Sequence, residues 1–184
     1  YRYNQILANE RKHKKRYGWE RKQNVKMLTS YLQEHNPHLK FGLCHGSRRG
    51  AEQHWFSQLL INHNTEVIGT EISPTATNYP LTIQWDFHDV KKKWINNVDF
   101  IYSNSLDHSY KPKECLDAWM SCIRKKTGIC IIAWEKDINW TVFDPFSASY
   151  KELKRFISRK YQVCDILEPK VKKDRKYFII KHKS

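Results

Sequence analysis

Acidic and polar residues follow several short apolar runs of the sequence, each time at the point where the run ends. Glu71 ends the second run, and Asp86 with Phe87 follows the third. A carboxylate at the first position can accept hydrogen bonds from both hydroxyls of a ribose. Asp86 can accept one from an exocyclic amine while Phe87 lies against the face of an adenine ring. This spacing predicts a site for a ligand that contains adenosine.

The first apolar run is followed by a loop with two glycines, four residues apart. Glycines between a strand and a helix let the backbone approach a ligand closely. Arg48 and Arg49 beside them can pair with a carboxylate of the ligand or with Glu52. The loop reads His45-Gly46-Ser47-Arg48-Arg49-Gly50.

The loop after the fourth run carries the residues best suited to acid–base chemistry. A neutral His108 at that position can take a proton from an attacking nitrogen or oxygen, and Asp107 is the second candidate. The alternative is that His108 only forms hydrogen bonds within its own loop. The full loop is Asn104-Ser105-Leu106-Asp107-His108.

Alternating strands and helices must position these residues. Helices are predicted up to residue 36, over 50–62, from Pro112 and from a capping box formed by Ser149 and Glu152. The alternation predicts an α/β fold whose mainly parallel, seven-stranded sheet has helices on both faces and ends in an antiparallel hairpin. The predicted strands are 39–44, 66–71, 81–85, 98–102, 129–134, 162–167 and 176–180.

The connection between the second and third predicted strands is unusually short. Only residues 72–80 separate them, and two of these are Pro. A parallel crossover usually needs about a dozen residues or more. Either the crossover is reduced to a loop or the strand limits differ. Asp86 has an alternative role as well, because it can cap a short helix predicted over residues 90–96.

The 184 residues suit one domain, and their charge is unevenly distributed. Residues 1–26 carry 9 Lys and Arg against 2 Asp and Glu, and residues 151–184 carry 12 against 4. The basic ends indicate either an anionic partner, RNA or DNA first, or merely a solvated surface. We expect a basic helical segment over 1–38, broken near Gly18, that packs on a domain over 39–184. Aromatic residues near the ends that can stack on bases, or more often pack in the core, are Tyr17, Trp19 and Tyr177.

The five cysteines are odd in number and form no CxxC motif, so neither a metal site nor a disulfide framework is expected. Cys44 and Cys130 lie in apolar runs and should pack as small hydrophobes. This usage is typical of the cytoplasm. No apolar run approaches the ~18 residues of a membrane span, so no membrane partner is expected.

Three segments resemble a methyltransferase-like group: GTEIS at 69–73, WDFHDV at 85–90 and YSNSLDHS at 102–109. The motif DPF of that group recurs at 144–146. With the glycine loop, the layout over 39–182 is similar to class I (Rossmann-like) S-adenosylmethionine-dependent methyltransferases. The sequence departs from the usual loop of that family at two positions. Cys44 replaces its acidic residue, and Arg48 replaces its middle glycine.

The resemblance implies an enzyme that transfers a methyl group from S-adenosylmethionine to a nitrogen or oxygen acceptor, with His108 and Asp107 as catalytic candidates. RNA, another polyanion or a small molecule can be that acceptor. The alternative is a non-catalytic module that binds nucleic acid. A dinucleotide dehydrogenase is disfavoured because the chain lacks GxGxxG. The implied cofactor contacts are His45, Gly46, Ser47, Arg48, Gly50, Glu71, Ile72, Asp86, Phe87, Asn104, Ser105 and Leu106.

Overall fold

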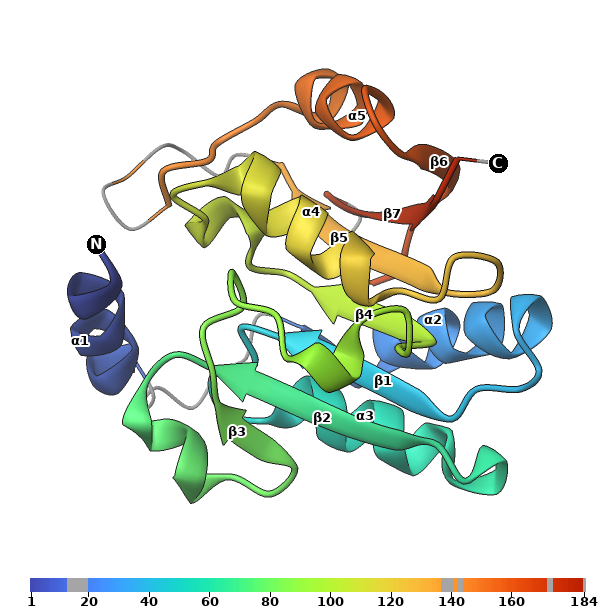
Figure 1. Ribbon diagram of the computed structural model, residues 1–184, viewed down its shortest axis with the longest axis horizontal. Helices are drawn as coiled ribbons and strands as arrows, with labels where there is room; N and C mark the ends of the chain where they lie inside the picture. The colour runs from blue at the N-terminus through green and yellow to red at the C-terminus, as the bar shows by residue number, and fades with distance from the viewer. Residues whose placement is uncertain (13–19, 137–140, 142–143, 172–173, 184) are drawn as a thin grey trace.

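A computed structural model describes the chain except residues 13–19, 137–140, 142–143, 172–173 and 184. Its centre is a seven-stranded sheet with the order β3-β2-β1-β4-β5-β7-β6 (Figure 1). The first five strands in the chain are parallel, and β7 pairs antiparallel with both β5 and β6. The predicted sheet with its terminal hairpin is therefore confirmed. The strands are β1 (Phe41–His45), β2 (Glu66–Glu71), β3 (Thr82–Gln84), β4 (Phe100–Ser103), β5 (Ile129–Glu135), β6 (Gln162–Leu167) and β7 (Arg175–Lys181).

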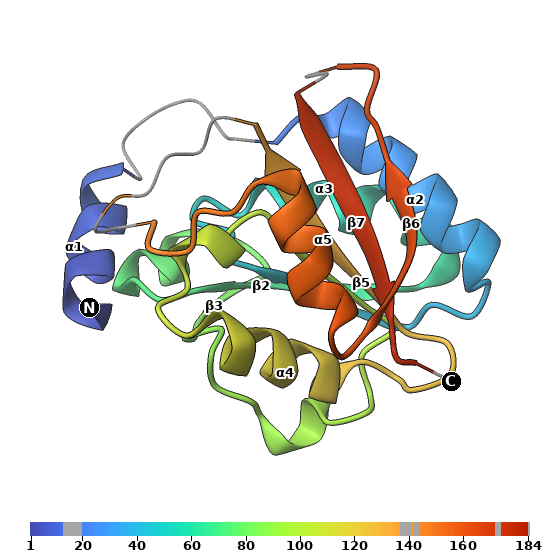
Figure 2. The ribbon, with the colours of Figure 1, turned by 90° about the horizontal axis from the view of Figure 1, so that it is seen from above.

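Helices cover both faces of this sheet (Figure 2). On one face α2 (Lys22–His35) and α3 (Ala51–Leu59) contribute apolar side chains to a core shared with the strands. On the other face α4 (Pro112–Cys122) and α5 (Tyr150–Ser158) do the same. The predicted capping box begins α5, where Ser149 and the carboxylate of Glu152 bond each other's backbone amides. Cys44 and Cys130 are buried in the two cores, as predicted.

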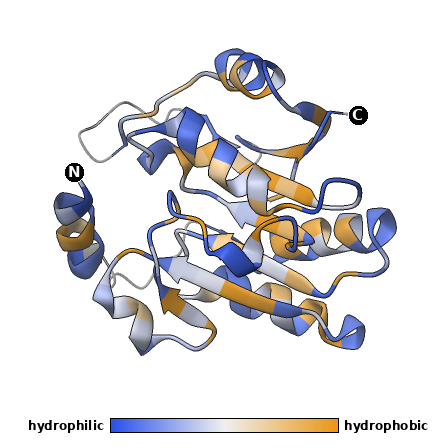
Figure 3. Cartoon of the chain, viewed as in Figure 1, coloured by the Kyte–Doolittle hydropathy of each residue, from blue (hydrophilic) through white to orange (hydrophobic). Residues whose placement is uncertain are grey.

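The remaining helix, α1 (Arg2–Lys12), belongs to neither layer. It lies at the edge of the molecule beyond the ends of β1 and β2 (Figures 1 and 2). Colouring by hydropathy shows apolar residues along β2 and β5 but polar residues over most of α1 (Figure 3). This helix therefore offers mainly polar groups to whatever it covers. Within the described residues no helix has the length and apolar character needed to cross a bilayer.

Of the two alternatives for the short connection between β2 and β3, the structure shows the reduced crossover. A 3₁₀ helix, Pro74–Asn78, replaces the usual α-helix, and Ser73 caps it by accepting a hydrogen bond from the amide of Thr75.

Two predicted helices were too long. Residues 50–62 divide into α3 and a 3₁₀ turn, Ile61–His63, and the helix predicted over 90–96 is only the 3₁₀ turn Lys92–Trp94. Weak amphipathic periodicity in such short segments does not distinguish 3₁₀ turns from α-helix.

The strand order reverses between β1 and β4. From β1 the chain continues outward to β2 and β3, and from β4 it continues in the opposite direction to β5. The connections that follow β1 and β4 therefore diverge and leave a crevice beyond the carboxyl ends of the two strands. In open α/β sheets this crevice is where ligands bind.

A buried carboxylate fastens the segment before α2 to the sheet. Glu20 accepts hydrogen bonds from the hydroxyls of Tyr102, at 2.5 Å, and Tyr177, at 2.9 Å. It also forms an ion pair with Arg175, at 2.8 Å, and the side chains of Glu20 and Arg175 are 0% and 3% exposed. A buried pair of this kind destabilises the fold strongly when one partner is removed, because the other charge is left without compensation.

Two further buried groups at this end of the sheet have shifted pKa values. Burial lowers the pKa of His45, which ends β1 with its ring bonded to the hydroxyl of Thr70, to about 3. Burial raises the pKa of Glu52, in the first turn of α3, to about 7, and the nearby carboxylate of Glu20 acts in the same direction. His45 is thus neutral in the folded state at neutral pH, while Glu52 is readily protonated.

Replacing Glu20 with Ala should lower the free energy of unfolding by about 3–5 kcal/mol, because Arg175 remains buried with its charge only partly compensated. Urea denaturation measures the loss. The matched control is Glu66→Ala, which removes an exposed carboxylate from β2. A loss below about 1 kcal/mol for Glu20→Ala would show that the pair is not buried as described.

The two shifted groups should make opposite contributions to stability between pH 7 and pH 5. The lowered pKa of His45 means that the unfolded chain binds the proton first, so acidification removes about 2 kcal/mol. The raised pKa of Glu52 means that the folded chain binds it first, so acidification adds a similar amount. His45→Gln should therefore gain, and Glu52→Gln lose, stability relative to the wild type as pH falls. Urea denaturation at the two pH values measures these changes. If the free energy of unfolding of both variants changed with pH as it does in the wild type, the prediction would be wrong.

Candidate functional site

A cavity of about 490 Å³, including its open mouth, lies in the crevice at the ends of the strands. One wall comes from the loops that follow β1, β2, β3 and β4, and the opposite wall comes from α1. Glu71, at the end of β2, and Asp86, after β3, both line it. The strand-end loops contribute Gly46, Arg48, Glu71, Ile72, Asp86, Phe87, His88, Ser105, His108 and Tyr110, and the helical segment contributes Tyr1, Arg2, Gln5 and Asn9.

The carboxylate of Glu71 is 1% exposed and is held at both oxygens. Its Oε2 accepts the backbone amide of Arg48 at 3.0 Å, which ties the glycine loop to the end of β2. Its Oε1 accepts the backbone amide of Ser73 at 2.9 Å and the side-chain amide of Asn9 at 2.8 Å. The backbone donors fix the orientation of the carboxylate, whereas Asn9 reaches it from α1.

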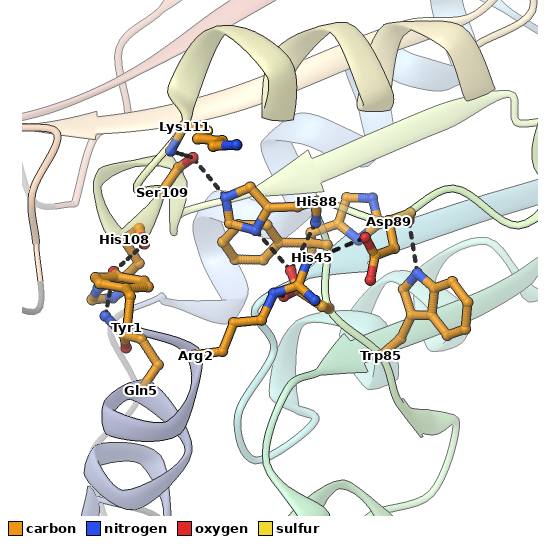
Figure 4. A network of polar contacts seen from close by, with 12 residues as sticks. Tyr1, Arg2, Gln5, His45, Trp85, His88, Asp89, His108, Ser109 and Lys111 are labelled. Carbon is orange, nitrogen blue, oxygen red and sulfur yellow. Dashed lines mark hydrogen bonds and ion pairs between the residues drawn. The ribbon is translucent and has the colours of Figure 1, made fainter.

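In Figure 4, Arg2 extends from α1 towards His88 and Asp89 in the loop after β3. Asp86, in the same loop, is contacted both from its own loop and from α1. Its Oδ1 accepts hydrogen bonds from the backbone amide of His88 at 2.9 Å and lies 2.7 Å from Nδ1 of the same ring. Its Oδ2 forms an ion pair with Nε of Arg2 at 2.7 Å. Burial alone would raise the pKa of Asp86, but the bonds from His88 and the charge of Arg2 outweigh it and lower the pKa. The carboxylate is therefore ionised at neutral pH.

The glycine loop has little room for side chains where it passes the cavity. Gly46 has a φ of +72°, and a Cβ atom there would lie 2.5 Å from Oγ of Ser105. Gly50, with a φ of +74°, begins α3. These positions need glycine for conformation and for space. Gly46 and Arg48 of this loop both line the cavity.

His108 lines the same cavity from the 3₁₀ turn Leu106–His108. Its Nδ1 lies 2.5 Å from Oδ1 of Asp144, and its carbonyl accepts a hydrogen bond from the hydroxyl of Tyr1. Burial raises the pKa of the adjacent Asp107, and the charge of Asp144 acts in the same direction. Asp107, His108 and Asp144 offer ligand atoms within 4.8 Å of one another, although the sequence indicated no metal site. The contact with Asp144 orients the imidazole at the wall of the cavity.

The structure brings together eight of the residues that the sequence assigned to the site. Six others lie around the cavity without lining it: His45, Ser47 and Leu106 are buried behind it, Gly50 begins α3, Asn104 bonds Glu52, and Asp107 faces elsewhere. Sequence reasoning missed all four residues of the helical segment. The only available signal was helical periodicity, which does not indicate where a helix packs on the rest of the fold.

Of the two roles weighed for Tyr177, stacking on bases and packing in the core, the structure shows packing in the core. It is 0% exposed, and its hydroxyl is bonded to Glu20 within the core. Alternation of apolar residues along a terminal strand does not reveal which face is covered, and α2 covers this one. Tyr17, Gly18 and Trp19 lie outside the described residues.

No family model and no curated protein matches the chain by sequence. Solved structures do match its fold. A 1,6-didemethyltoxoflavin-N1-methyltransferase from Burkholderia thailandensis, with bound S-adenosylhomocysteine, superimposes with a TM-score of 0.67 at 14% identity, over 97% of this chain and 84% of the other. An S-adenosylmethionine-dependent methyltransferase from Clostridium acetobutylicum gives 0.66 at 10% identity, over 99% of both chains.

A third structure, a SAM-dependent methyltransferase from Aquifex aeolicus, gives a TM-score of 0.62 at 15% identity, over 88% of this chain and 98% of the other. At these identities the likeness concerns the fold. The strand order, the antiparallel β7 and the crevice at the switch point agree with it. The chain therefore has the Rossmann-like fold of S-adenosylmethionine-dependent methyltransferases.

Proposed function

We propose that the chain binds S-adenosylmethionine in the cavity at the strand ends and transfers its methyl group to a nitrogen or oxygen acceptor. The observation that carries this proposal is that Glu71 ends β2, Asp86 follows the neighbouring β3, and both line one cavity at the switch point. Ribose hydroxyls and an adenine amine are donors, and these carboxylates are the matching acceptors. The fold shared with methyltransferases supports the same conclusion.

Each part of the cofactor has a chemically suitable partner in the cavity. Glu71 would accept from the ribose hydroxyls, and Asp86 with Phe87 would hold the adenine. Gly46 lacks a Cβ and so lets the loop pack closely against Ser105, and its backbone lines the cavity, where the methionine part would lie. Arg48 also lines the cavity, and its guanidinium would suit the methionine carboxylate. The cofactor supplies the activated methyl group, and the residues position it.

His108 is the residue we propose as general base. It lines the cavity, and the contact of Asp144 with Nδ1 positions the imidazole to take the proton that an amine or hydroxyl releases on methylation. Many methyl transfers need no base, since positioning alone lowers much of the barrier. Asp107 lines a different cavity on the other side of the same turn.

Side chains of α1 already contact the two carboxylates, Glu71 and Asp86, that we assign to the cofactor. Asn9 donates to Glu71, and Arg2 is paired with Asp86. A ligand that bonds both carboxylates must take the place of these two donors. We infer that the side chains of α1 and the cofactor compete for the same acceptors, although the backbone amides that hold Glu71 remain in place.

The chemical class of the methyl acceptor is a separate proposal. The B. thailandensis neighbour is named as an N1-methyltransferase of a small molecule, and another neighbour as a plantazolicin methyltransferase. A small molecule is therefore our first candidate. RNA is the second, on the basic ends of the chain. Salt distinguishes them, because methylation of a polyanion should fall steeply as ionic strength rises. We further propose the cytoplasm as the compartment, on the cysteine usage.

Glu71→Ala and Asp86→Ala should each weaken the binding of S-adenosylhomocysteine by about 1–3 kcal/mol, because each leaves polar groups of the ligand without a partner. Titration calorimetry measures the change. Asp89→Ala is the matched control, since Asp89 lies in the same loop, contacts Arg2 and does not line the cavity. Unchanged affinity in both variants would remove this site, and the non-catalytic module would replace it.

Arg2→Ala and Asn9→Ala should instead strengthen the binding of S-adenosylhomocysteine, each by up to about 1 kcal/mol or fivefold, because each frees an acceptor. Arg11→Ala changes an exposed residue of the same helix and serves as the control. Calorimetry gives the sign. Weaker binding in the two variants would show that α1 holds the cofactor rather than competing with it.

A further inference from the structure

A second cavity, of about 360 Å³, lies beside the first. The carboxyl end of β5 forms its floor, with Trp134 among the lining residues. Phe146 and Ala148, from the segment before α5, form another wall, and Leu153 of α5 closes one side. The indole of Trp134 donates to the carbonyl of Ala148 at 2.8 Å, which fastens this segment to the sheet. The size lies at the lower end of the range for small-molecule sites.

One 3₁₀ turn separates the two cavities. Ser105 and His108 line the first cavity, while Leu106 and Asp107, which lie between them in sequence, line the second. The backbone amide of Phe146 donates to the carbonyl of Asp107 at 3.0 Å, so the turn and the segment before α5 form one wall. A molecule in the second cavity therefore lies one turn away from the place that we assign to the cofactor.

The lining of the second cavity is chemically selective. Its surface is mainly aliphatic and aromatic, and its two charged residues are Asp107 and Glu135. Glu135 forms an ion pair with Arg175, so its charge is compensated. Among the described residues no Lys or Arg lines the cavity. A phosphate would thus lose its hydration without gaining a cation, whereas a neutral or cationic nitrogen would find a carboxylate at Asp107.

We propose that this second cavity binds the methyl acceptor, and that the acceptor is a small aromatic amine whose ring lies against Trp134 and Phe146 with its nitrogen directed to Asp107. This inference rests on the proposed function and specifies its substrate class. It places Asp107 on the substrate and makes His108, on the opposite side of the turn, the residue that faces the cofactor.

The transfer balances with the groups named. The lone pair of the neutral amine nitrogen forms the new N–C bond, and the C–S bond of the sulfonium breaks with its electron pair on sulfur. Asp107 accepts the hydrogen bond that orients the amine, and the released proton goes to the imidazole of His108, whose ring offers a nitrogen within 4.8 Å of a carboxylate oxygen of Asp107.

The test measures binding of named probes to the full chain saturated with S-adenosylhomocysteine. Aniline and tryptamine are the amines, and benzoate and indoleacetate are their acidic counterparts. Saturation-transfer NMR reports binding without requiring turnover. Ala148→Phe fills the cavity, and Ala148→Ser, which keeps nearly the same volume, is the matched control. Calorimetry of each variant with S-adenosylhomocysteine verifies the first cavity.

We expect the amines to bind the wild type and Ala148→Ser, and to bind Ala148→Phe at least about tenfold more weakly, with the affinity for S-adenosylhomocysteine unchanged. Amines that bind Ala148→Phe equally well would overturn the site. Acids that bind as tightly as amines, or no binding by either amine, would overturn the substrate class. Failure of the wild type to bind S-adenosylhomocysteine would instead count against the proposed function.

Discussion

The reversal of strand order between β1 and β4 is the constraint on which the site depends. Because the connections after these strands leave in opposite directions, a crevice is left beyond their ends. The loops after β1, β2, β3 and β4 all end at this space, so residues from four distant parts of the sequence line one cavity. Their positions are set by the parallel register of the strands, which places Glu71 beside Gln84, two residues before Asp86.

Buried polar groups hold this end of the sheet together. Glu20 joins the chain before α2 to Tyr102 of β4 and to Arg175 and Tyr177 of β7. Glu71 joins the glycine loop to the residues after β2 through backbone amides. Both carboxylates accept hydrogen bonds from fixed donors, which compensates the cost of burying them. The cavity is consequently formed by a rigid set of strand ends, on which α1 lies as a separate polar element.

The two cavities divide the roles in a way consistent with methyl transfer. The first offers carboxylates and exposed backbone, which suit the polar, hydroxyl-rich adenosine. The second is apolar apart from Asp107 and its paired neighbour Glu135. The 3₁₀ turn Leu106–His108 forms part of both walls, so one short segment would contact both reactants. Its attachment to residues 144–146 through His108 and Phe146 fixes that segment between them.

Local sequence determined much of this architecture. Apolar runs identified seven strands, and the residues after them identified Glu71, Asp86 and His108, because the strand end at which side chains gather follows from parallel pairing alone. Only tertiary structure decided the rest. The docking of α1 on the cavity, the burial of Tyr177 and the contact between His108 and Asp144 join residues far apart in the chain. Such contacts depend on how whole elements pack, and no local pattern encodes the direction from which a polar helix approaches.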